Sequence, residues 1–169
     1  LHELDLIIYA TGFDAMTGAF DRIDFIGAEG VKLRDRWAEG PETYLGIGSV
    51  GFPNLIVLAG PQSGSDFTKF GRGVEEAVDW VTALIGHLRD HGLTRIEATP
   101  EAQDDWCQHV RDMYDLLLLG KVRSWFTGVN SNIEGRDTIR HVVYNGGAPR
   151  YRKHLTEVAE QGYAGFALA

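Results

Sequence analysis

Two glycine-rich segments of this sequence contain the residue types that bind phosphate groups. Residues 46–51 read Gly-Ile-Gly-Ser-Val-Gly, which matches the dinucleotide fingerprint. That fingerprint binds phosphate only between a strand and a helix, because the N-terminus of the helix holds the pyrophosphate. Here Phe52-Pro53-Asn54 and then a predicted strand follow. We therefore predict that residues 46–51 do not cradle a phosphate.

The second segment, residues 60–65, lies after a predicted buried strand and shortly before a predicted helix. Open α/β sheets collect ligands at this position. The glycines permit close approach of the backbone, and Ser63, Ser65 and Thr68 offer hydroxyl groups. A strand-to-helix loop with one helix-capping hydroxyl explains the same residues equally well, so both interpretations stay open.

Three side chains that bind metals or act as nucleophiles lie in helical patterns. His87 and His91 stand one helical turn apart, which presents two imidazoles together, but no further metal ligand is evident. Cys107 has no activating partner in its pattern, which favours inert packing. We expect no metal site, and the pattern identifies no catalytic residue.

Composition limits the class of protein. The chain has 169 residues, of which 44% are hydrophobic and 24% charged, a balance typical of globular domains. Its 16 basic and 24 acidic residues give a net charge of −8, which disfavours general nucleic-acid binding. The sequence has one cysteine, no signal peptide, no initiator Met and no apolar run near the ~20 residues of a membrane span. We expect a soluble, cytoplasmic chain without nucleic-acid or membrane partners, cut from a longer parent.

Positive charge is concentrated in residues 121–153, where seven Lys and Arg residues face only Glu134 and Asp137. Such a patch suits an anionic ligand or an acidic surface of the parent protein. A solvated face with ion pairs inside the chain explains it at least as well, so both alternatives stay open.

Hydropathy patterns predict an α/β fold. Short apolar runs predict strands buried on both faces, and apolar residues at helical spacing predict helices. Thr99-Pro100-Glu101 is a helix start signal, and Gly92 and Gly162 are helix ends. The expected elements are strands at 5–10 and 55–59, a small hairpin at 25–33, helices at 73–89, 99–117 and 151–161, and strands at 125–127 and 141–144 around a polar loop at 130–138.

Seven short segments follow one another in an order that points to a known family. They are residues 5–15 (with Ala10-Thr11-Gly12), Tyr44-Leu45-Gly46, residues 51–55 (Gly-Phe-Pro-Asn-Leu), Ala59-Gly60-Pro61, Glu75 with Val78 and Trp80-Val81, residues 124–130 (Ser-Trp-Phe-Thr-Gly-Val-Asn) and residues 151–166. In this order they resemble the C-terminal third of the Baeyer–Villiger flavin monooxygenases, the family that contains cyclohexanone and phenylacetone monooxygenases.

The resemblance implies the C-terminal portion of a flavoprotein with two dinucleotide-binding domains. Residues 1–92 would be the closing part of the FAD-binding domain, with strands, hairpin, cavity loop and helix. Residues 93–169 would be a C-terminal helical segment with the loop that covers NADP. The family's nucleotide motifs and its catalytic Arg lie upstream of the matched region. The resemblance therefore implies no catalytic residue here, and a chain that needs the N-terminal part of the same enzyme and is inactive alone.

The resemblance also implies the reaction. In the family, NADPH reduces FAD, O2 adds to give a peroxyflavin, and this attacks a ketone to yield an ester or lactone. Trp125 and Asn130 would meet the nicotinamide-ribose end of NADP. The substrate cavity would be lined by Ser65, Asp66, Phe67 and Phe70, and the implied cofactor-binding set is Thr11, Gly12, Gly60, Pro61, Phe70, Trp125 and Asn130.

Two departures from the family limit what transfers. The family's loop continues from Asn through Pro-Gly-Lys, whereas residues 130–136 are longer and lack the proline. Residues 66–70 are bulkier or more charged than expected, so the substrate preference does not transfer. The alternatives are another flavin monooxygenase, which oxidises amine nitrogen or sulfide sulfur, and a non-catalytic binding or scaffold domain that kept the fold.

Overall fold

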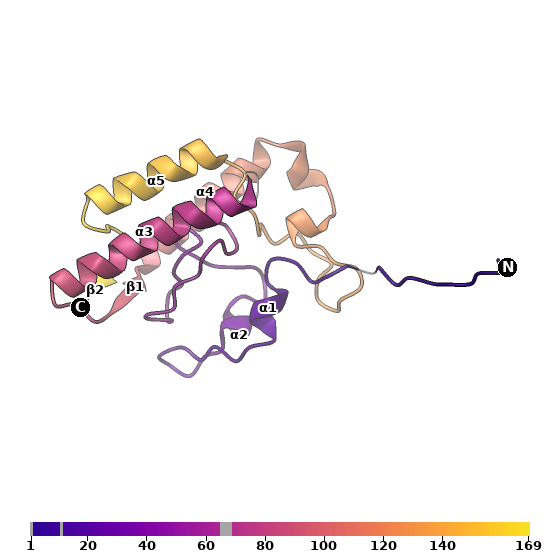
Figure 1. Ribbon diagram of the computed structural model, residues 1–169, viewed down its shortest axis with the longest axis horizontal. Helices are drawn as coiled ribbons and strands as arrows, with labels where there is room; N and C mark the ends of the chain where they lie inside the picture. The colour runs from indigo at the N-terminus through magenta and orange to yellow at the C-terminus, as the bar shows by residue number, and fades with distance from the viewer. Residues whose placement is uncertain (1, 11, 65–68) are drawn as a thin grey trace.

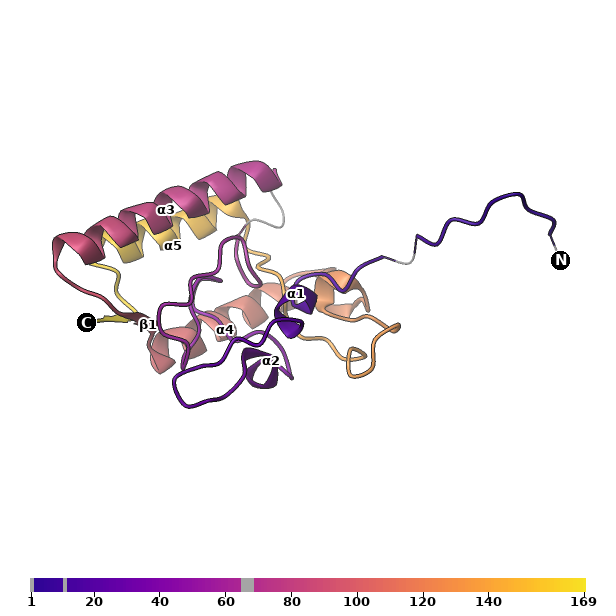
Figure 2. The same ribbon diagram turned by 60° about the horizontal axis from the view of Figure 1, so that its bottom comes forward.

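Three long helices and one irregular segment, residues 37–64, form the body of the molecule. The computed structural model describes residues 2–10, 12–64 and 69–169. In Figures 1 and 2, α3 and α5 lie side by side in one layer, and α4 lies in another, with irregular chain between them. The elements are α1 (Gly18–Asp21), α2 (Leu33–Arg36), α3 (Phe70–Asp90), β1 (Ile96–Ala98), α4 (Pro100–Asp115), the 3-10 turns η1 (Leu118–Lys121) and η2 (Trp125–Thr127), α5 (Ala148–Glu160) and β2 (Phe166–Leu168).

The three predicted helices are confirmed, with shifted ends. α3 begins at Phe70 rather than at residue 73, and Gly92 ends it with a φ of +67° while the Leu93 N–H donates to the Leu88 carbonyl at 2.8 Å. α4 begins at the predicted signal, where the Thr99 hydroxyl oxygen accepts from the Ala102 N–H at 3.3 Å. α5 begins at Ala148 rather than at residue 151.

The core lies where α3, α4 and α5 face the irregular segment. Leu84 of α3, Val110 and Tyr114 of α4, Leu155 of α5 and Leu45 of the irregular segment are all buried in one cluster. Burial of such side chains contributes roughly 1.5–3 kcal/mol each to folding. The helices therefore hold a long irregular segment in place by covering it.

Buried tyrosine hydroxyls supply the hydrogen bonds that this irregular chain does not make with itself. Tyr151 donates to the Leu45 carbonyl at 2.6 Å, and Tyr114 donates to the Phe126 carbonyl at 2.9 Å. The Tyr114 hydroxyl also accepts from the Val143 N–H at 3.0 Å. Buried backbone groups need such partners, because leaving one unpaired costs about 1–3 kcal/mol.

A two-stranded antiparallel sheet, which the sequence patterns do not predict, closes the C-terminus onto the body. Ile96 of β1 pairs with Leu168 of β2, and Ala98 pairs with Phe166. The Thr94 and Arg95 N–H groups both donate to the Ala169 carbonyl at 2.7 Å. The sheet thus joins the chain after α3 to the chain after α5.

The predicted strands at 5–10 and 55–59 do not form in this chain. Residues 5–10 are extended and exposed, and they run away from the body (Figure 1). A strand buried on both faces needs two neighbours to take its N–H and C=O groups, and no described segment lies beside this one. In residues 55–59, the Val57 N–H donates to the Ile47 carbonyl at 2.9 Å, but no ladder develops.

The predicted strands at 125–127 and 141–144 are also wrong. Residues 125–127 form η2, in which the Thr127 hydroxyl oxygen accepts from the Ser124 N–H at 3.1 Å and Gly128 closes the turn at a φ of +76°. Val142 and Val143 are fully buried, but the chain bends at Val143, and their backbone bonds go to Gln62 and Tyr114 rather than to a strand.

The predicted hairpin at 25–33 is reduced to one bridge. Ile26 and Lys32 pair as an isolated antiparallel bridge, and the Gly27 N–H donates to the Val31 carbonyl at 2.8 Å. Leu33 then begins α2 instead of extending the strand. Among the described residues, no helix is both long and apolar enough to cross a lipid bilayer.

Candidate functional site

Two distant parts of the chain line one groove. Residues 12–22 form one wall and residues 125–133 form the other, around adjoining cavities of about 720 and 440 Å³. Gly12, Phe13 and Asn130 line both cavities, Arg22 lines the larger and Trp125 the smaller. The structure therefore brings together Gly12, Trp125 and Asn130, three residues of the predicted cofactor-binding set.

The first wall is fixed by a short helix and an aromatic contact. α1 follows Gly12 and Asp14 and carries Phe20, whose ring lies 5.3 Å from that of Trp37 in an edge-to-face arrangement. Trp37 belongs to a small buried cluster with Leu33 and Phe52. Gly12 has a φ of +83° and open space where a Cβ would stand, so it bends the chain at the groove without filling it.

The second wall is a loop closed by its own backbone bonds. The Asn130 N–H donates to the Arg136 carbonyl at 2.7 Å, and the Ile133 N–H donates to the Asn130 carbonyl at 3.1 Å. The Asn130 side-chain oxygen accepts from the Asn132 N–H at 3.2 Å. These bonds give residues 130–136 a compact shape despite the absence of a proline.

Trp125 stands on η2 at the edge of the groove and is 49% exposed. Its ring stacks on Phe126 with 3.7 Å between centroids. About half of the Trp125 side chain is therefore accessible at the groove, and its indole N–H is a hydrogen-bond donor.

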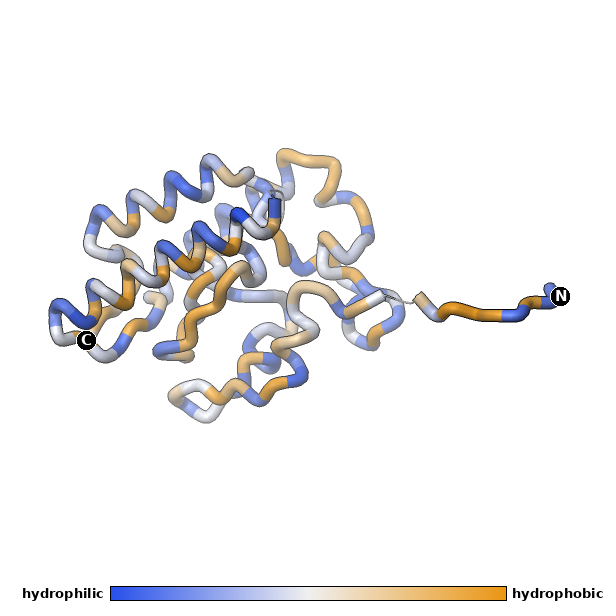
Figure 3. Tube along the Cα trace, viewed as in Figure 1, coloured by the Kyte–Doolittle hydropathy of each residue, from blue (hydrophilic) through white to orange (hydrophobic). Residues whose placement is uncertain are grey.

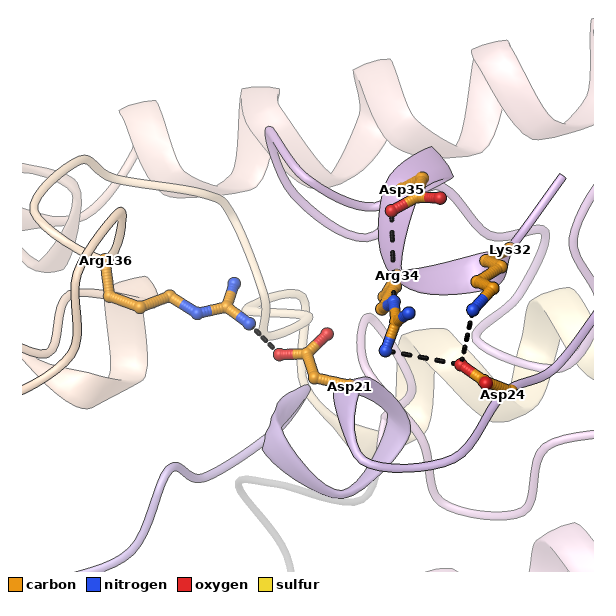
Figure 4. Close-up of polar contacts among 6 residues, drawn as sticks. All are labelled: Asp21, Asp24, Lys32, Arg34, Asp35 and Arg136. Atoms are coloured by element: carbon orange, nitrogen blue, oxygen red, sulfur yellow. Dashed lines mark hydrogen bonds and ion pairs between the residues drawn. The ribbon is translucent and has the colours of Figure 1, made fainter.

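Charged side chains join the two walls. The Arg136 guanidinium donates to the Asp21 carboxylate and lies 3.9 Å from that of Asp14. Figure 4 shows Arg136 reaching from its loop toward Asp21 on α1. Arg140, which is buried, donates to the Gly128 carbonyl and to the Thr17 hydroxyl, each at 3.3 Å. Sequence reasoning missed the contacts with Asp14, Thr17 and Asp21, because they link residues more than a hundred positions apart.

A second charged cluster in Figure 4 joins Asp24 to Lys32 and to Arg34 of α2. Asp24 accepts from Lys32 at 3.1 Å and pairs with Arg34 at 3.2 Å. The hydrogen bond and the charge of Lys32 hold the pKa of the Asp24 carboxyl below its usual value. These side chains are half exposed, so the cluster adds little to stability.

For the cationic segment 121–153, the structure favours ion pairs inside the chain. Arg136 pairs with Asp21, Arg152 with Glu76 at 3.2 Å, and Lys153 with Glu157 at 3.6 Å. These three cations are therefore paired within the chain.

Among the described residues, three other members of the predicted cofactor-binding set, Gly60, Pro61 and Phe70, do not line this groove. Gly60 and Pro61 are buried, and a Cβ on Gly60 would overlap the Val57 side chain. Phe70, the first residue of α3, is 63% exposed and lies outside both groove cavities. Thr11 and three predicted cavity residues, Ser65, Asp66 and Phe67, lie outside the described residues.

The other motifs have packing roles. Gly46 in the fingerprint-like segment has a φ of +68°, and a Cβ there would come within 2.6 Å of the Ser63 nitrogen. Burial raises the pKa of the Cys107 thiol, which favours the inert thiol over the thiolate. His91 and His87 stack with 4.1 Å between ring centroids, and the described part of the chain holds no group of three metal-binding side chains.

Comparison with known proteins gives a consistent picture. The chain is 41% identical over 167 residues to cyclopentanone 1,2-monooxygenase of Comamonas sp. (strain NCIMB 9872), covering 99% of this chain and 30% of the relative. It is 36% identical over 167 residues to phenazine N-monooxygenase PhzNO1 of Lysobacter antibioticus, covering 99% of this chain and 30% of that protein. No family model matches the chain.

Solved structures agree with these relatives. The structure of OTEMO in complex with FAD and NADP superposes with a TM-score of 0.89 at 43% identity, covering 99% of this chain and 30% of that one. The predicted resemblance to Baeyer–Villiger flavin monooxygenases, and the fold class that it implies, are confirmed. The chain spans about 30% of the length of the proteins that it matches.

Proposed function

We propose that this chain is the C-terminal part of an FAD- and NADPH-dependent Baeyer–Villiger monooxygenase that uses O2 to convert ketones to esters or lactones. The convergence of Gly12, Trp125 and Asn130 on one groove carries the proposal. The relative that acts on cyclopentanone and the solved neighbour that holds FAD and NADP support it.

The groove fits the nicotinamide end of a dinucleotide. It offers a half-exposed indole face on Trp125 and amide groups on Asn130 and Asn132, with the Arg22 side chain at its lining. A flat ring can stack on the indole, amides can meet ribose hydroxyls, and a guanidinium suits phosphate. Trp125 and Asn130 would therefore hold NADP, and the two cofactors supply hydride transfer and oxygen activation when bound.

The chain's own residues would bind and orient the cofactors and the ketone, and they would exclude water from the site. Trp125 presents a large rigid surface with few rotatable bonds, which suits a side chain that covers a bound ring. In the proposal, Thr11, Gly12, Gly60, Pro61 and Phe70 contact cofactor. Ser65, Asp66, Phe67 and Phe70 line the ketone cavity.

The proposal assigns the catalytic Arg, and most of the nucleotide-binding surface, to the preceding N-terminal part of the same enzyme. Residues 1–92 then complete the FAD-binding domain, and residues 93–169 form the helical segment with the NADP-covering loop. The 169 residues alone would be inactive. We also propose a cytoplasmic location without membrane or nucleic-acid partners.

The test uses the protein encoded by the complete open reading frame that contains this chain. We expect bound FAD, NADPH oxidation that depends on a ketone such as cyclopentanone, and a lactone as product. The 169-residue chain is the matched control and should show neither bound FAD nor NADPH oxidation. A complete protein that binds no flavin would overturn the proposal in favour of a scaffold role.

The relative named as a phenazine N-monooxygenase favours a second candidate, oxygenation of nitrogen by the same cofactors. Product analysis separates the two. Turnover of phenazine to an N-oxide, with no lactone formed from cyclopentanone, would favour N-oxygenation.

A further inference from the structure

The two walls of the groove come from parts of the chain more than a hundred residues apart. Contacts between them must therefore fix their relative position. Two arginines that follow the second wall in the chain, Arg136 and Arg140, contact residues of the first wall in different ways. Arg140 donates to a neutral partner there, the Thr17 hydroxyl, and also to the Gly128 carbonyl of the second wall. Arg136 uses charged ones, the carboxylates of Asp21 and Asp14.

The Arg136 cluster is shielded from solvent. The side chains of Arg136, Asp14 and Asp21 are 11%, 14% and 29% exposed, whereas those of Arg34 and Asp24, which follow the first wall in the chain, are 41% and 56% exposed. Shielded charges attract more strongly and are screened less by salt. The Arg136 cluster can therefore hold a loop in a way that the Arg34 cluster cannot.

The backbone passes this anchoring on to the groove. The carbonyl of Arg136 accepts from the N–H of Asn130 at 2.7 Å, so the residue that binds the first wall also binds the residue that lines both cavities. Asn132, which lines the larger cavity, is held to the Asn130 side chain in turn.

We propose that Arg136 is the positioning residue of this groove: its pairing with Asp21 and Asp14 holds residues 130–136 against residues 12–22 and thereby sets Asn130 opposite Gly12. The nature of the ligand, a nicotinamide dinucleotide, rests on the proposed function. Arg136 does not touch the ligand, and it acts through the position of Asn130.

The experiment compares Arg136→Gln, Asp21→Asn and the charge-exchanged double variant Arg136→Asp with Asp21→Arg in the complete protein. Arg34→Gln is the matched control, because it breaks an exposed ion pair of the same chemistry that does not involve either wall of the groove. Asp21→Asn leaves Arg136 with Asp14, so it keeps the test open if Arg136→Gln fails to fold.

The first measurement is hydrogen exchange of residues 128–138 without nucleotide. We expect roughly tenfold faster exchange in Arg136→Gln, a smaller increase in Asp21→Asn, partial recovery in the exchanged double variant and no change in Arg34→Gln. Unchanged exchange in both Arg136→Gln and Asp21→Asn would overturn the proposal.

The second measurement is the dissociation constant of NADP+. We expect Arg136→Gln to raise it roughly tenfold and Arg34→Gln to leave it unchanged. Faster loop exchange with an unchanged dissociation constant would overturn the positioning role while leaving the proposed function intact. An unmodified complete protein that binds no NADP+ would overturn the proposed function, and the exchange measurement then decides whether Arg136 holds the loop.

Discussion

Residues 5–10 at the N-terminus and residues 141–144 in the core are both apolar segments, but the first is exposed and the second is mostly buried. Residues 5–10 read Asp-Leu-Ile-Ile-Tyr-Ala, and Leu6 is 74% exposed. Residues 141–144 read His-Val-Val-Tyr, and Val142 and Val143 are fully buried. Figure 3 shows the apolar N-terminal segment stretched away from the body.

The difference lies in what covers each segment. Residues 142–144 pack in the core cluster with residues of α4 and α5, and the Tyr114 hydroxyl oxygen accepts a hydrogen bond from the Val143 N–H. Residues 5–10 have no such neighbour among the described residues. An apolar sequence therefore favours burial, but the segment is buried only where other parts of the fold pack against it.

Truncating one leucine in each region of the 169-residue chain tests whether the core and residues 5–10 differ in burial, and it has the largest expected effect. Leu84→Ala should lower the free energy of unfolding by about 2–5 kcal/mol, because it leaves a cavity in the core. Leu6→Ala should change it by less than about 0.5 kcal/mol. Urea unfolding followed by far-UV circular dichroism measures both. Equal losses would show that residues 5–10 are packed in solution.

A second pair of substitutions tests whether the irregular chain in the core tolerates an added methyl group as well as a helix does. Gly46→Ala should destabilise by about 2–3 kcal/mol, because the residue has a left-handed φ and its new Cβ would meet the Ser63 backbone. Gly71→Ala is the matched control, since this α3 residue has open space at Cβ and should be stabilised by up to about 1 kcal/mol. Thermal unfolding of the two variants gives the answer. A harmless Gly46→Ala would mean that the irregular segment adapts freely.

The same comparison explains how much of the fold the sequence predicts. Helices α3, α4 and α5 are predicted because their signals are local: apolar spacing, the Thr99 cap and Gly92 at a helix end. Strands at 5–10 and 55–59 are not realised, because a strand depends on partners that a local pattern cannot specify. The β1–β2 pair was missed for the same reason, since three-residue strands carry no readable alternation.

Some residues of the groove are predictable from the sequence and others are not. Gly12, Trp125 and Asn130 were found through matched segments, and the structure places them together. Arg136 and Asp21 were not found, because a pair separated by more than a hundred residues leaves no local pattern. Gly60 and Pro61 illustrate the converse, since glycine and proline after an apolar run fit a tight buried turn as well as a ligand loop.

Removing one hydroxyl from each region tests the polar side of the comparison. Tyr114→Phe should lower the free energy of unfolding by about 1–3 kcal/mol, because the Phe126 carbonyl and the Val143 N–H lose a buried partner. Tyr9→Phe, in the exposed segment, should have no measurable effect. Chemical denaturation at one pH measures both changes. If Tyr114→Phe were neutral, water rather than the hydroxyl would be satisfying those backbone groups.

The smallest expected effect is the pH dependence of stability that arises from His109 and His154, two histidines of the body of the molecule. Burial is the main cause that lowers the pKa of His109 and of His154, and the two imidazoles, with ring centroids 5.1 Å apart, also lie near Arg150. Their folded-state pKa values thus lie below the ordinary value of 6.5. Between the two values the unfolded chain binds more protons than the folded chain.

The sign of the pH dependence follows from this proton balance. Above about pH 6.5 these histidines do not change the unfolding free energy with pH, and they lower it as the pH falls from about 6.5 toward their folded-state pKa values. The double variant His109→Gln with His154→Gln should therefore flatten the decline in unfolding free energy on the acid side, leaving the part due to His141, whose pKa burial also lowers. Denaturant titrations between about pH 5 and pH 7.5 measure the slope, and an unaltered slope in the double variant would mean that these imidazoles are as hydrated in the folded chain as in the unfolded one.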